Sequence, residues 1–407
     1  MKTDLPVLLR NATFLDGSGA SGRSGELFVE KGKIAQPPAS LSSSVRVWDL
    51  QGCHVSPGWV DLHVHVFSGY GVFSVSPSEV GSFTGVTTLV DAGSAGALSY
   101  PVFAKLIREN TQERIVSYVN IASPGLQHGN NQVRGFVGDH CHSSFHSEEL
   151  ALGLLAHYAD SIAGWKIRLT LALADGDEAK ERRAFEALLK VKKDSGRPVM
   201  IHHAKSSIPI DELLDALDEG DVYTHCFHGY GNAPFEDGTG RPRASTLEAR
   251  RRGVLFDVGH GMGAFFWDVA EKACKEYGFW PDTISSDIHR YNLFGPVCNL
   301  GNVLSKFLHL GMPLEKVIAA ATGNTAPALR HVHVAPSLAE GAPATLTVFQ
   351  IEEGEFAFYD VVGEKRMGSR RIVPMAVLQN GNLTTCYGLH MRHADGDALS
   401  RAWQGIA

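Results

Sequence analysis

The 407-residue chain lacks the features that mark several protein classes. Its six cysteines are scattered and no two form a C-x-x-C pair, which excludes a zinc ribbon and argues against a disulfide framework. No stretch approaches the roughly 18 uninterrupted apolar residues of a membrane span. Positive charge is in deficit, with 37 Lys and Arg against 44 Asp and Glu, which disfavours nucleic acid as a partner. We therefore expect reduced thiols and neither membrane nor nucleic acid as a partner.

The first ten residues carry one lysine before a short apolar run but have no signal-peptide core or cleavage site, so we expect a cytoplasmic protein. Hydrophobic residues make up 44% and charged residues 20%, as in ordinary soluble globular proteins. The length would suit two or three domains, although α/β barrels often exceed the usual domain size. The sequence determines neither the oligomeric state nor the physiological metal, and it leaves open whether the protein forms a homo-oligomer.

Two kinds of pattern divide the chain. Short apolar or alternating runs separated by turn residues indicate β-strands near the start, at 7–13, 25–29 and 45–50, and near the end, at 345–351, 355–359, 371–377 and 381–385. Between them, apolar runs alternate with helix-like segments, which indicates parallel βαβ units. The expected strands there are 58–66, 86–92, 114–121, 162–169, 198–203, 221–227, 254–258 and 283–287. The expected helices are 99–109, 147–158, 177–193, 210–217, 245–252, 268–277 and 302–310.

Eight such units over roughly 250 residues favour a closed (β/α)8 barrel of the TIM type over an open doubly wound sheet. We expect residues 57–335 to form this barrel. Residues 1–56 and 336–407 would together form a small β-sandwich domain built from both termini. The tail at 390–407 has no pattern that assigns it a structure.

Two histidines stand at the end of the first expected barrel strand, in Val60-Asp61-Leu62-His63-Val64-His65. Alternate residues of a strand share a face, so His63 and His65 point the same way. The C-terminal ends of the strands form the active face of this fold, and two imidazoles there are half of a metal site. The alternative, two histidines packed inside the barrel, would require partners for four ring nitrogens.

Polar residues also end four other expected strands, where packing would prefer Val, Ile or Leu. They are Lys166, His202, His225 and Asp287. Four histidines and an aspartate exceed the three protein ligands of a typical catalytic zinc and suit two divalent ions about 3.5–4 Å apart. A neutral lysine amine can add CO2, and the resulting carbamate has two oxygens that can bridge two cations. The pattern therefore predicts a two-metal site.

These motifs resemble those of the amidohydrolase superfamily. The run Pro57-Gly58-Trp59-Val60-Asp61-Leu62-His63-Val64-His65 resembles its opening motif, in particular that of the branch with a carboxylated lysine, which contains dihydroorotase, dihydropyrimidinase and related deacetylases. The segments 164–168, 224–227, 257–261 and 284–289 are more similar still to a dihydroorotase-like group described as metal-dependent deacetylases. The resemblance spans about residues 57–330 and implies a barrel with a split β-sandwich domain.

The resemblance also implies a role for each ligand. His63 and His65 would bind the buried metal, and His202 and His225 the exposed one. Carboxylated Lys166 would bridge both ions, which are expected to be zinc. Asp287 would contact the buried metal and carry protons during catalysis. His202 is preferred to His203 because strand register places it with the other ligands.

Three further residues are candidates for substrate binding, each with a structural alternative. Arg168 shares the strand face of Lys166 and would grip a substrate carboxylate, unless it braces a loop. His260 ends the seventh expected strand and would contact substrate or orient a ligand, unless it belongs to a structural turn. His289 follows Asp287 by two positions and would act beside it. The segments 127–131 and 203–207 depart from the family pattern on the substrate side, and Ala344-Thr345-Leu346 departs from it in the sandwich.

The predicted function is hydrolysis of a small-molecule substrate, in which Asp287 takes a proton from water and passes it to the leaving group. The leading hypothesis is a deacetylase that cleaves a small acyl amide or ester of an α-amino or α-hydroxy acid. One alternative is a cyclic amidase of the dihydroorotase or hydantoinase kind. A remote alternative is a non-catalytic scaffold, although such proteins usually lose ligands. The sequence leaves the substrate, its stereochemistry and the choice between amide and ester open.

Overall fold

The computed structural model describes residues 6–126 and 137–386. The expected loop at 127–131 and the tail at 390–407 therefore lie outside the described residues. Within the described part of the chain, no helix combines the length and apolar character needed to span a bilayer.

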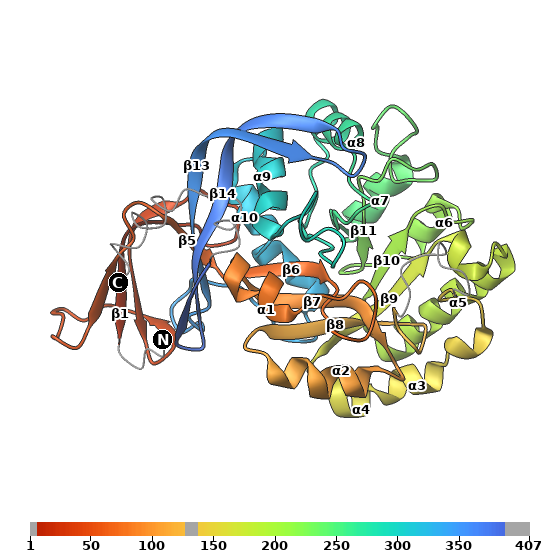
Figure 1. The fold of residues 1–407 in the computed structure, drawn as a ribbon, viewed down its shortest axis with the longest axis horizontal. Helices are drawn as coiled ribbons and strands as arrows, with labels where there is room; N and C mark the ends of the chain where they lie inside the picture. The colour runs from red at the N-terminus through yellow and green to blue at the C-terminus, as the bar shows by residue number, and fades with distance from the viewer. Residues whose placement is uncertain (1–5, 127–136, 387–407) are drawn as a thin grey trace.

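A curled parallel sheet forms the centre of the molecule, with strands in the order β12-β11-β10-β9-β8-β7-β6 (Figure 1). Its strands are β6 (Trp59–Val64), β7 (Val86–Gly96), β8 (Arg114–Asn120), β9 (Ile162–Leu169), β10 (Val199–His203), β11 (Val222–Thr224) and β12 (Leu255–Phe256). Each matches an expected strand, although β11 and β12 are shorter than expected. Because both faces of this sheet are covered, successive residues of these strands are buried and the strands do not alternate between buried and exposed positions.

Helices connect the strands and surround the sheet. They are α1 (Pro77–Val80), α2 (Tyr100–Leu106), α3 (Glu148–Gly153), α4 (Leu155–Tyr158), α5 (Glu178–Ser195), α6 (Ile210–Asp215), α7 (Ala244–Arg251), α8 (Trp267–Glu271), α9 (Leu300–Leu310) and α10 (Leu314–Ala320). The helix expected at 147–158 is divided into α3 and α4, and the last turns of the helix expected at 268–277 are a π-helix. The sequence did not predict α1.

The eighth expected strand, 283–287, is not a regular strand. Single bridges join Thr283 to Asp257 on one side and Ile288 to Val64 on the other, and the His65 N–H donates to the Ile288 carbonyl at 3.1 Å. The backbone turns at Asp287, whose φ of 47° is incompatible with an extended ladder. This segment still occupies the gap between β12 and β6, so the barrel expected from the sequence is confirmed with an irregular eighth member.

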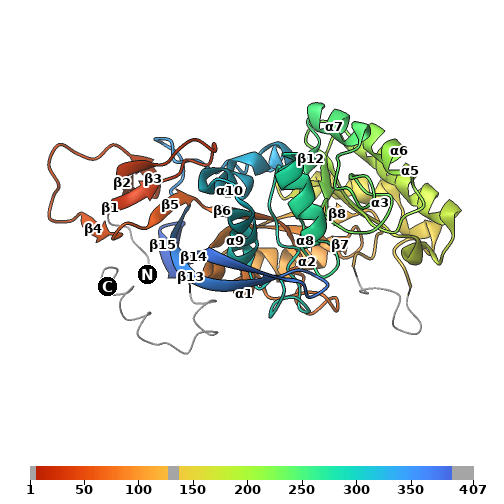
Figure 2. The same cartoon turned by 90° about the horizontal axis from the view of Figure 1, so that it is seen from above.

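The strands from the two ends of the chain form one second sheet, as expected. Its order is β15-β14-β13-β5-β1-β2-β3, with β4 paired to β1, and it lies beside the barrel in Figures 1 and 2. The strands are β1 (Val7–Phe14), β2 (Arg23–Glu30), β3 (Lys33–Ala35), β4 (Arg46–Asp49), β5 (His54–Pro57), β13 (Leu346–Tyr359), β14 (Lys365–Gln379) and β15 (Asn382–Thr385). The N-terminal and C-terminal strands meet where β5 pairs with β13. The domain boundaries at 56 and 336 stay a prediction.

The hairpin of β13 and β14 extends far beyond the second sheet. The two strands expected at 345–351 and 355–359 are one continuous strand, β13. Figure 1 shows the hairpin running from the second sheet past α9 to α8. There the Val361 N–H donates to the Phe265 carbonyl at 3.2 Å, and Arg366 forms an ion pair with Glu271 at 2.9 Å. The hairpin therefore places the C-terminal part of the chain against the barrel loops.

Candidate metal centre

The six predicted metal ligands come from five different places around the C-terminal end of the barrel. His63 is on β6 and His65 just follows it, Lys166 is on β9, and His202 is on β10. His225 directly follows β11, and Asp287 lies in the irregular eighth segment. His225 and Asp287 have φ angles of 67° and 47°, a left-handed conformation that costs roughly 1–3 kcal/mol in non-glycine residues and is concentrated at functional sites. The turned backbone carries both side chains toward the barrel axis.

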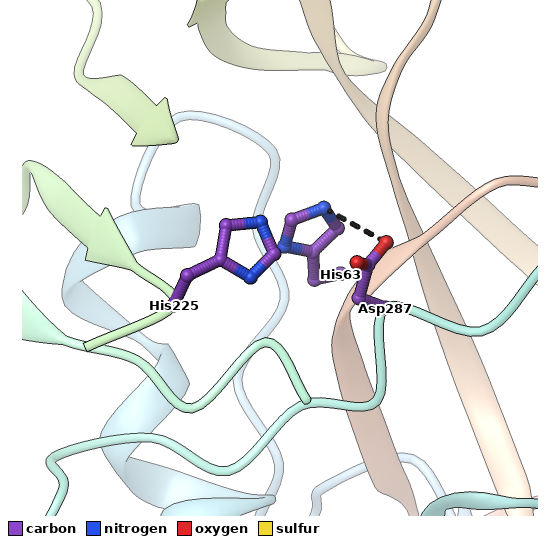
Figure 3. Close-up of side chains that lie close together, drawn as sticks. All are labelled: His63, His225 and Asp287. Atoms are coloured by element: carbon purple, nitrogen blue, oxygen red, sulfur yellow. Dashed lines mark ion pairs between the residues drawn. The ribbon is translucent and has the colours of Figure 1, made fainter. Parts of the chain in front are cut away.

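The structure brings the imidazoles and the carboxylate together. Donor atoms of His63, His225 and Asp287 all lie within 4.8 Å of one another (Figure 3). The Oδ1 atom of Asp287 is 3.4 Å from Nε2 of His63 and 3.1 Å from Nε2 of His65. The ring centroid of His202 is 4.4 Å from that of His225. Five predicted ligands thus surround one small volume.

Lys166 is the unusual member of this cluster. Its side chain is 1% exposed, and among the described residues its Nζ has no hydrogen-bond partner. Burial lowers its pKa to about 7, although the charge of Asp287 acts in the opposite direction. A bare glycine makes room for it, because a Cβ on Gly93 would come within 2.8 Å of the Lys166 Cγ atom. A buried amine without a partner is costly, so this position requires a function or a modification.

Hydrogen bonds fix which nitrogen of two imidazoles faces the cluster. The Thr224 hydroxyl donates to Asp257 at 2.7 Å, so it accepts from Nδ1 of His63 at 2.9 Å. The Nδ1 of His225 is 2.5 Å from the Gly259 carbonyl, which can only accept. Both rings therefore carry their proton on Nδ1 and direct the Nε2 lone pair inward, as metal-binding histidines do. His65 is held through its Nδ1 by the Ser94 hydroxyl at 3.0 Å.

Burial keeps these imidazoles neutral. It lowers the pKa of His65 to about 3 and that of His225 to about 4, and it holds the pKa of His63 and His202 well below the usual value. Burial also raises the pKa of the Asp287 carboxyl, although the nearby charges of Lys166 and Arg168 act in the opposite direction. Neutral imidazoles and a carboxylate are the nitrogen and oxygen donors that zinc and similar divalent ions prefer. The residues present therefore fit divalent metal ions.

His203, the neighbour of His202, points elsewhere. Its Nε2 donates to the Ile208 carbonyl at 2.9 Å, and its Nδ1 lies 3.3 Å from the Tyr223 hydroxyl. Both contacts are within the buried packing around β10 and β11. The structure thus places His202, and not His203, beside the other predicted ligands.

The three candidate substrate residues have different surroundings. Arg168 donates through Nε and Nη2 to both oxygens of Asp139, at 2.9 and 2.7 Å, so the fork expected to grip a substrate carboxylate holds a carboxylate of the protein. His260 contacts Nζ of Lys306 through Nε2 at 2.6 Å and the Gly261 carbonyl through Nδ1 at 3.0 Å. Both of its ring nitrogens are therefore engaged within the protein, which favours the structural alternative.

His289 is placed differently. Its Nδ1 accepts from the Tyr291 N–H at 3.2 Å, so its proton is on Nε2. Burial lowers its pKa to about 4, which keeps the ring neutral. Its ring centroid lies 6.4 Å from that of His65 and 4.8 Å from that of Phe73. Next to the cluster, His289 offers a hydrogen-bond donor in place of a lone pair, which suits a substrate oxygen better than a metal.

Sequence reasoning did not predict the residues that support the cluster. Asp257 accepts from the hydroxyls of Thr224, Thr283 and Ser285, and Asp61 accepts from the N–H and hydroxyl of Ser286. Both aspartates lie within motifs that the sequence analysis singled out, but their contacts cross between strands. The sequence signals for Asp139 and Lys306 were weaker. Asp139 is a single charged residue in a polar loop, and Lys306 is a single charged residue on an otherwise apolar helix.

Comparisons with known proteins identify the family of the chain. No protein-family model matches the chain. A curated deacetylase of Agrobacterium fabrum is 34% identical over 369 residues, which cover 88% of this chain and 86% of the relative. A curated deacetylase of Enterococcus faecalis is 29% identical, with 93% and 99% covered. The chain belongs to the amidohydrolase superfamily.

Solved structures support the same placement. The chain resembles a dihydroorotase with a TM-score of 0.81 and 30% identity, covering 94% of this chain and 98% of the other. It resembles an adenine deaminase with a TM-score of 0.82 and 27% identity, covering 94% and 100%. The likeness to an N-acyl-D-glutamate deacylase of Bordetella bronchiseptica, at 17% identity and a TM-score of 0.58, concerns the fold alone. The chain is thus an amidohydrolase and a metal-dependent hydrolase, and the scaffold alternative is not supported.

Proposed function

We propose that this amidohydrolase is a two-metal deacetylase that cleaves a small acyl amide or ester of an α-amino or α-hydroxy acid. The observation that carries the proposal is the buried, unpartnered amine of Lys166 among neutral imidazoles and one carboxylate. The curated deacetylases that resemble the chain support the acyl substrate. The scattered cysteines, no two of which form a C-x-x-C pair, support a cytoplasmic location.

In this proposal each ligand has one place. His63, His65 and Asp287 would hold the buried ion, and His202 and His225 would hold the exposed one. Lys166, once carboxylated, would supply an anionic ligand to both. The lone pair of its neutral amine forms a bond to the carbon of CO2, one C=O electron pair moves to oxygen, and the nitrogen loses a proton to solvent. The resulting anion would give the two cations the oxygen ligand that a bare lysine lacks.

Two divalent cations, which we propose are zinc, would lower the pKa of a water molecule to about 7 and polarise the scissile carbonyl. Asp287 accepts the proton of the attacking water and passes it to the leaving nitrogen or oxygen. Its position, with Oδ1 within 3.4 Å of two ligand imidazoles, supports this role. Proton transfer by a positioned side chain contributes about 10²–10⁴-fold to the rate.

The substrate's polar groups would meet two side chains at the rim. His289 donates from Nε2 to a substrate oxygen beside the cluster. Lys205 is exposed, with its ammonium 4.3 Å from the centre of the Tyr230 ring, and it offers a charge for a carboxylate. Arg168 would hold the loop that carries Asp139 in place through their ion pair, and it would not itself bind the substrate carboxylate.

The test is a screen of acylated amino and hydroxy acids, D and L, on enzyme of known metal content. We expect release of acetate or a similar small acid from part of this set. The dihydroorotase at 30% identity favours a cyclic amidase as the second candidate, so dihydroorotate and hydantoins belong in the same screen. Ring opening without any deacylation would reject the deacetylase and support that alternative.

A further inference from the structure

A second lysine is buried near the candidate metal centre and takes no part in the proposed chemistry. Lys306 lies on α9, its side chain is 0% exposed, and its ammonium has three acceptors. These are Nε2 of His260 at 2.6 Å, the Pro296 carbonyl at 3.1 Å and the Tyr359 carbonyl at 2.5 Å. Acceptors from three separate segments of the chain thus surround this nitrogen.

One of these segments holds two predicted ligands in place. The loop 257–261 contains His260, and its Gly259 carbonyl accepts from Nδ1 of His225. Gly261 lies against Asp287, since a Cβ at this position would come within 2.3 Å of the Asp287 Oδ2 atom. Any shift of this loop would therefore move the acceptor of His225 and the space that Asp287 occupies.

Another of the segments is the tip of the β13–β14 hairpin, which begins in the second sheet. Tyr359 is the last residue of β13. The next residue, Asp360, accepts from the backbone N–H groups of Trp267, Val362 and Glu364, and so fixes the tip against α8. Lys306 thus stands between this tip and the loop at the metal centre.

We propose that Lys306 is a positioning residue through which the β13–β14 hairpin holds the loop 257–261, and with it His225 and Asp287, in the geometry for metal binding. The inference rests on the proposed function for the identity of the ligands. It gives the long hairpin a role in the site, although none of its residues reaches the cluster of ligands.

The test compares Lys306→Met, which keeps the length of the side chain but loses its donors, with Lys192→Met. Lys192 is a matched control at the opposite end of the barrel, because its Nζ also has three acceptors: Ala216, Asp218 and Asp221. Zinc affinity is measured by competition with a chelator, and stability by thermal unfolding of the metal-free proteins. Both variants should unfold at lower temperature. Only Lys306→Met should also bind zinc about 10–100-fold more weakly, the loss typical of a missing outer partner.

Two further readouts separate this inference from the proposed function. In the metal-free protein, Lys306→Met should speed hydrogen exchange at the amides of His260 and Gly261, which donate to Ser285 and Ser286, whereas Lys192→Met should not. Asp360→Ala should weaken zinc binding in the parent chain and have no further effect in Lys306→Met. Unchanged zinc affinity and unchanged exchange in Lys306→Met would overturn the inference. Absence of zinc binding in the parent chain, with faster exchange in the variant, would reject the metal site and leave the loop-positioning role of Lys306 standing.

Discussion

Replacing Thr224 with valine removes one hydroxyl from the middle of a hydrogen-bond chain. Thr224 is fully buried, accepts from Nδ1 of His63 at 2.9 Å, and donates to Asp257 at 2.7 Å. Valine has nearly the same shape, so the change leaves no large cavity. It does leave the Nδ1–H of His63 without its acceptor, and it removes one of the three hydroxyl donors to Asp257.

The magnitude follows from these contacts. An unsatisfied buried polar group costs about 1–3 kcal/mol, so the free energy of unfolding of the metal-free protein should fall by about that amount. The ring of His63 would also lose the contact that fixes its tautomer and orientation. Loss of such an outer partner lowers metal affinity by about 10–100-fold.

Denaturant unfolding of the metal-free protein and chelator competition for zinc measure the two effects separately. Thr224→Ser, which keeps the hydroxyl, is the control and should lie much closer to the parent chain in both. A valine variant with parental stability and parental zinc affinity would refute the view that the Thr224–Asp257 pair orients His63.

Three other predictions follow from the site. Lys166→Ala should lose most of the second metal ion and nearly all turnover, and short carboxylic acids should restore part of both; a high-resolution density map with both metals and a bare lysine amine would refute carboxylation. Esterifying the substrate carboxylate should lower kcat/KM by about 10–100-fold, because this is the contribution of a charge-assisted hydrogen bond. Lys205→Met should lower kcat/KM by part of that factor on the free acid and leave it unchanged on the ester. Equal rates on acid and ester would reject a carboxylate clamp. Burial lowers the pKa of Lys306 from 10.5 to about 7, although the charges of Cys298 and Asp360 act in the opposite direction. Between these two pH values the lysine is protonated in the unfolded chain and neutral in the folded chain, so the unfolded chain binds one more proton. The stability of the metal-free parent should therefore rise with pH relative to Lys306→Met in that window, and a constant difference between their unfolding free energies from pH 7 to 9 would contradict this.

Much of the fold could be predicted because it depends on local patterns. Seven of the eight barrel strands are buried runs, and the polar residues at or near the ends of β6, β9, β10 and β11 mark the active face of the barrel. The eighth could not be predicted as irregular from composition, since its departure follows from the turned backbone at Asp287 and from hydroxyl contacts of Ser285 and Ser286 to other strands. The continuous β13 was also missed, because its polar middle resembles a turn.

The candidate ligands could be predicted for the same reason, since strand alternation alone places His63 and His65 on one face. The partners of the candidate substrate residues could not be predicted, although a side chain's partner decides its role. Arg168 has the expected position, yet Asp139, from a distant loop, takes its donors. His260 lies in the loop that follows β12, where Lys306, 46 residues later, engages its ring. Such pairings depend on how helices and loops pack, which spacing along the chain does not encode.

The central claim is that His63, His65, Lys166, His202, His225 and Asp287 hold two divalent ions in each chain. Elemental analysis of the purified protein after metal-replete expression tests it most directly. We expect about two zinc-type ions per chain, because the ligand set exceeds what one ion uses. A firm value of zero would contradict it.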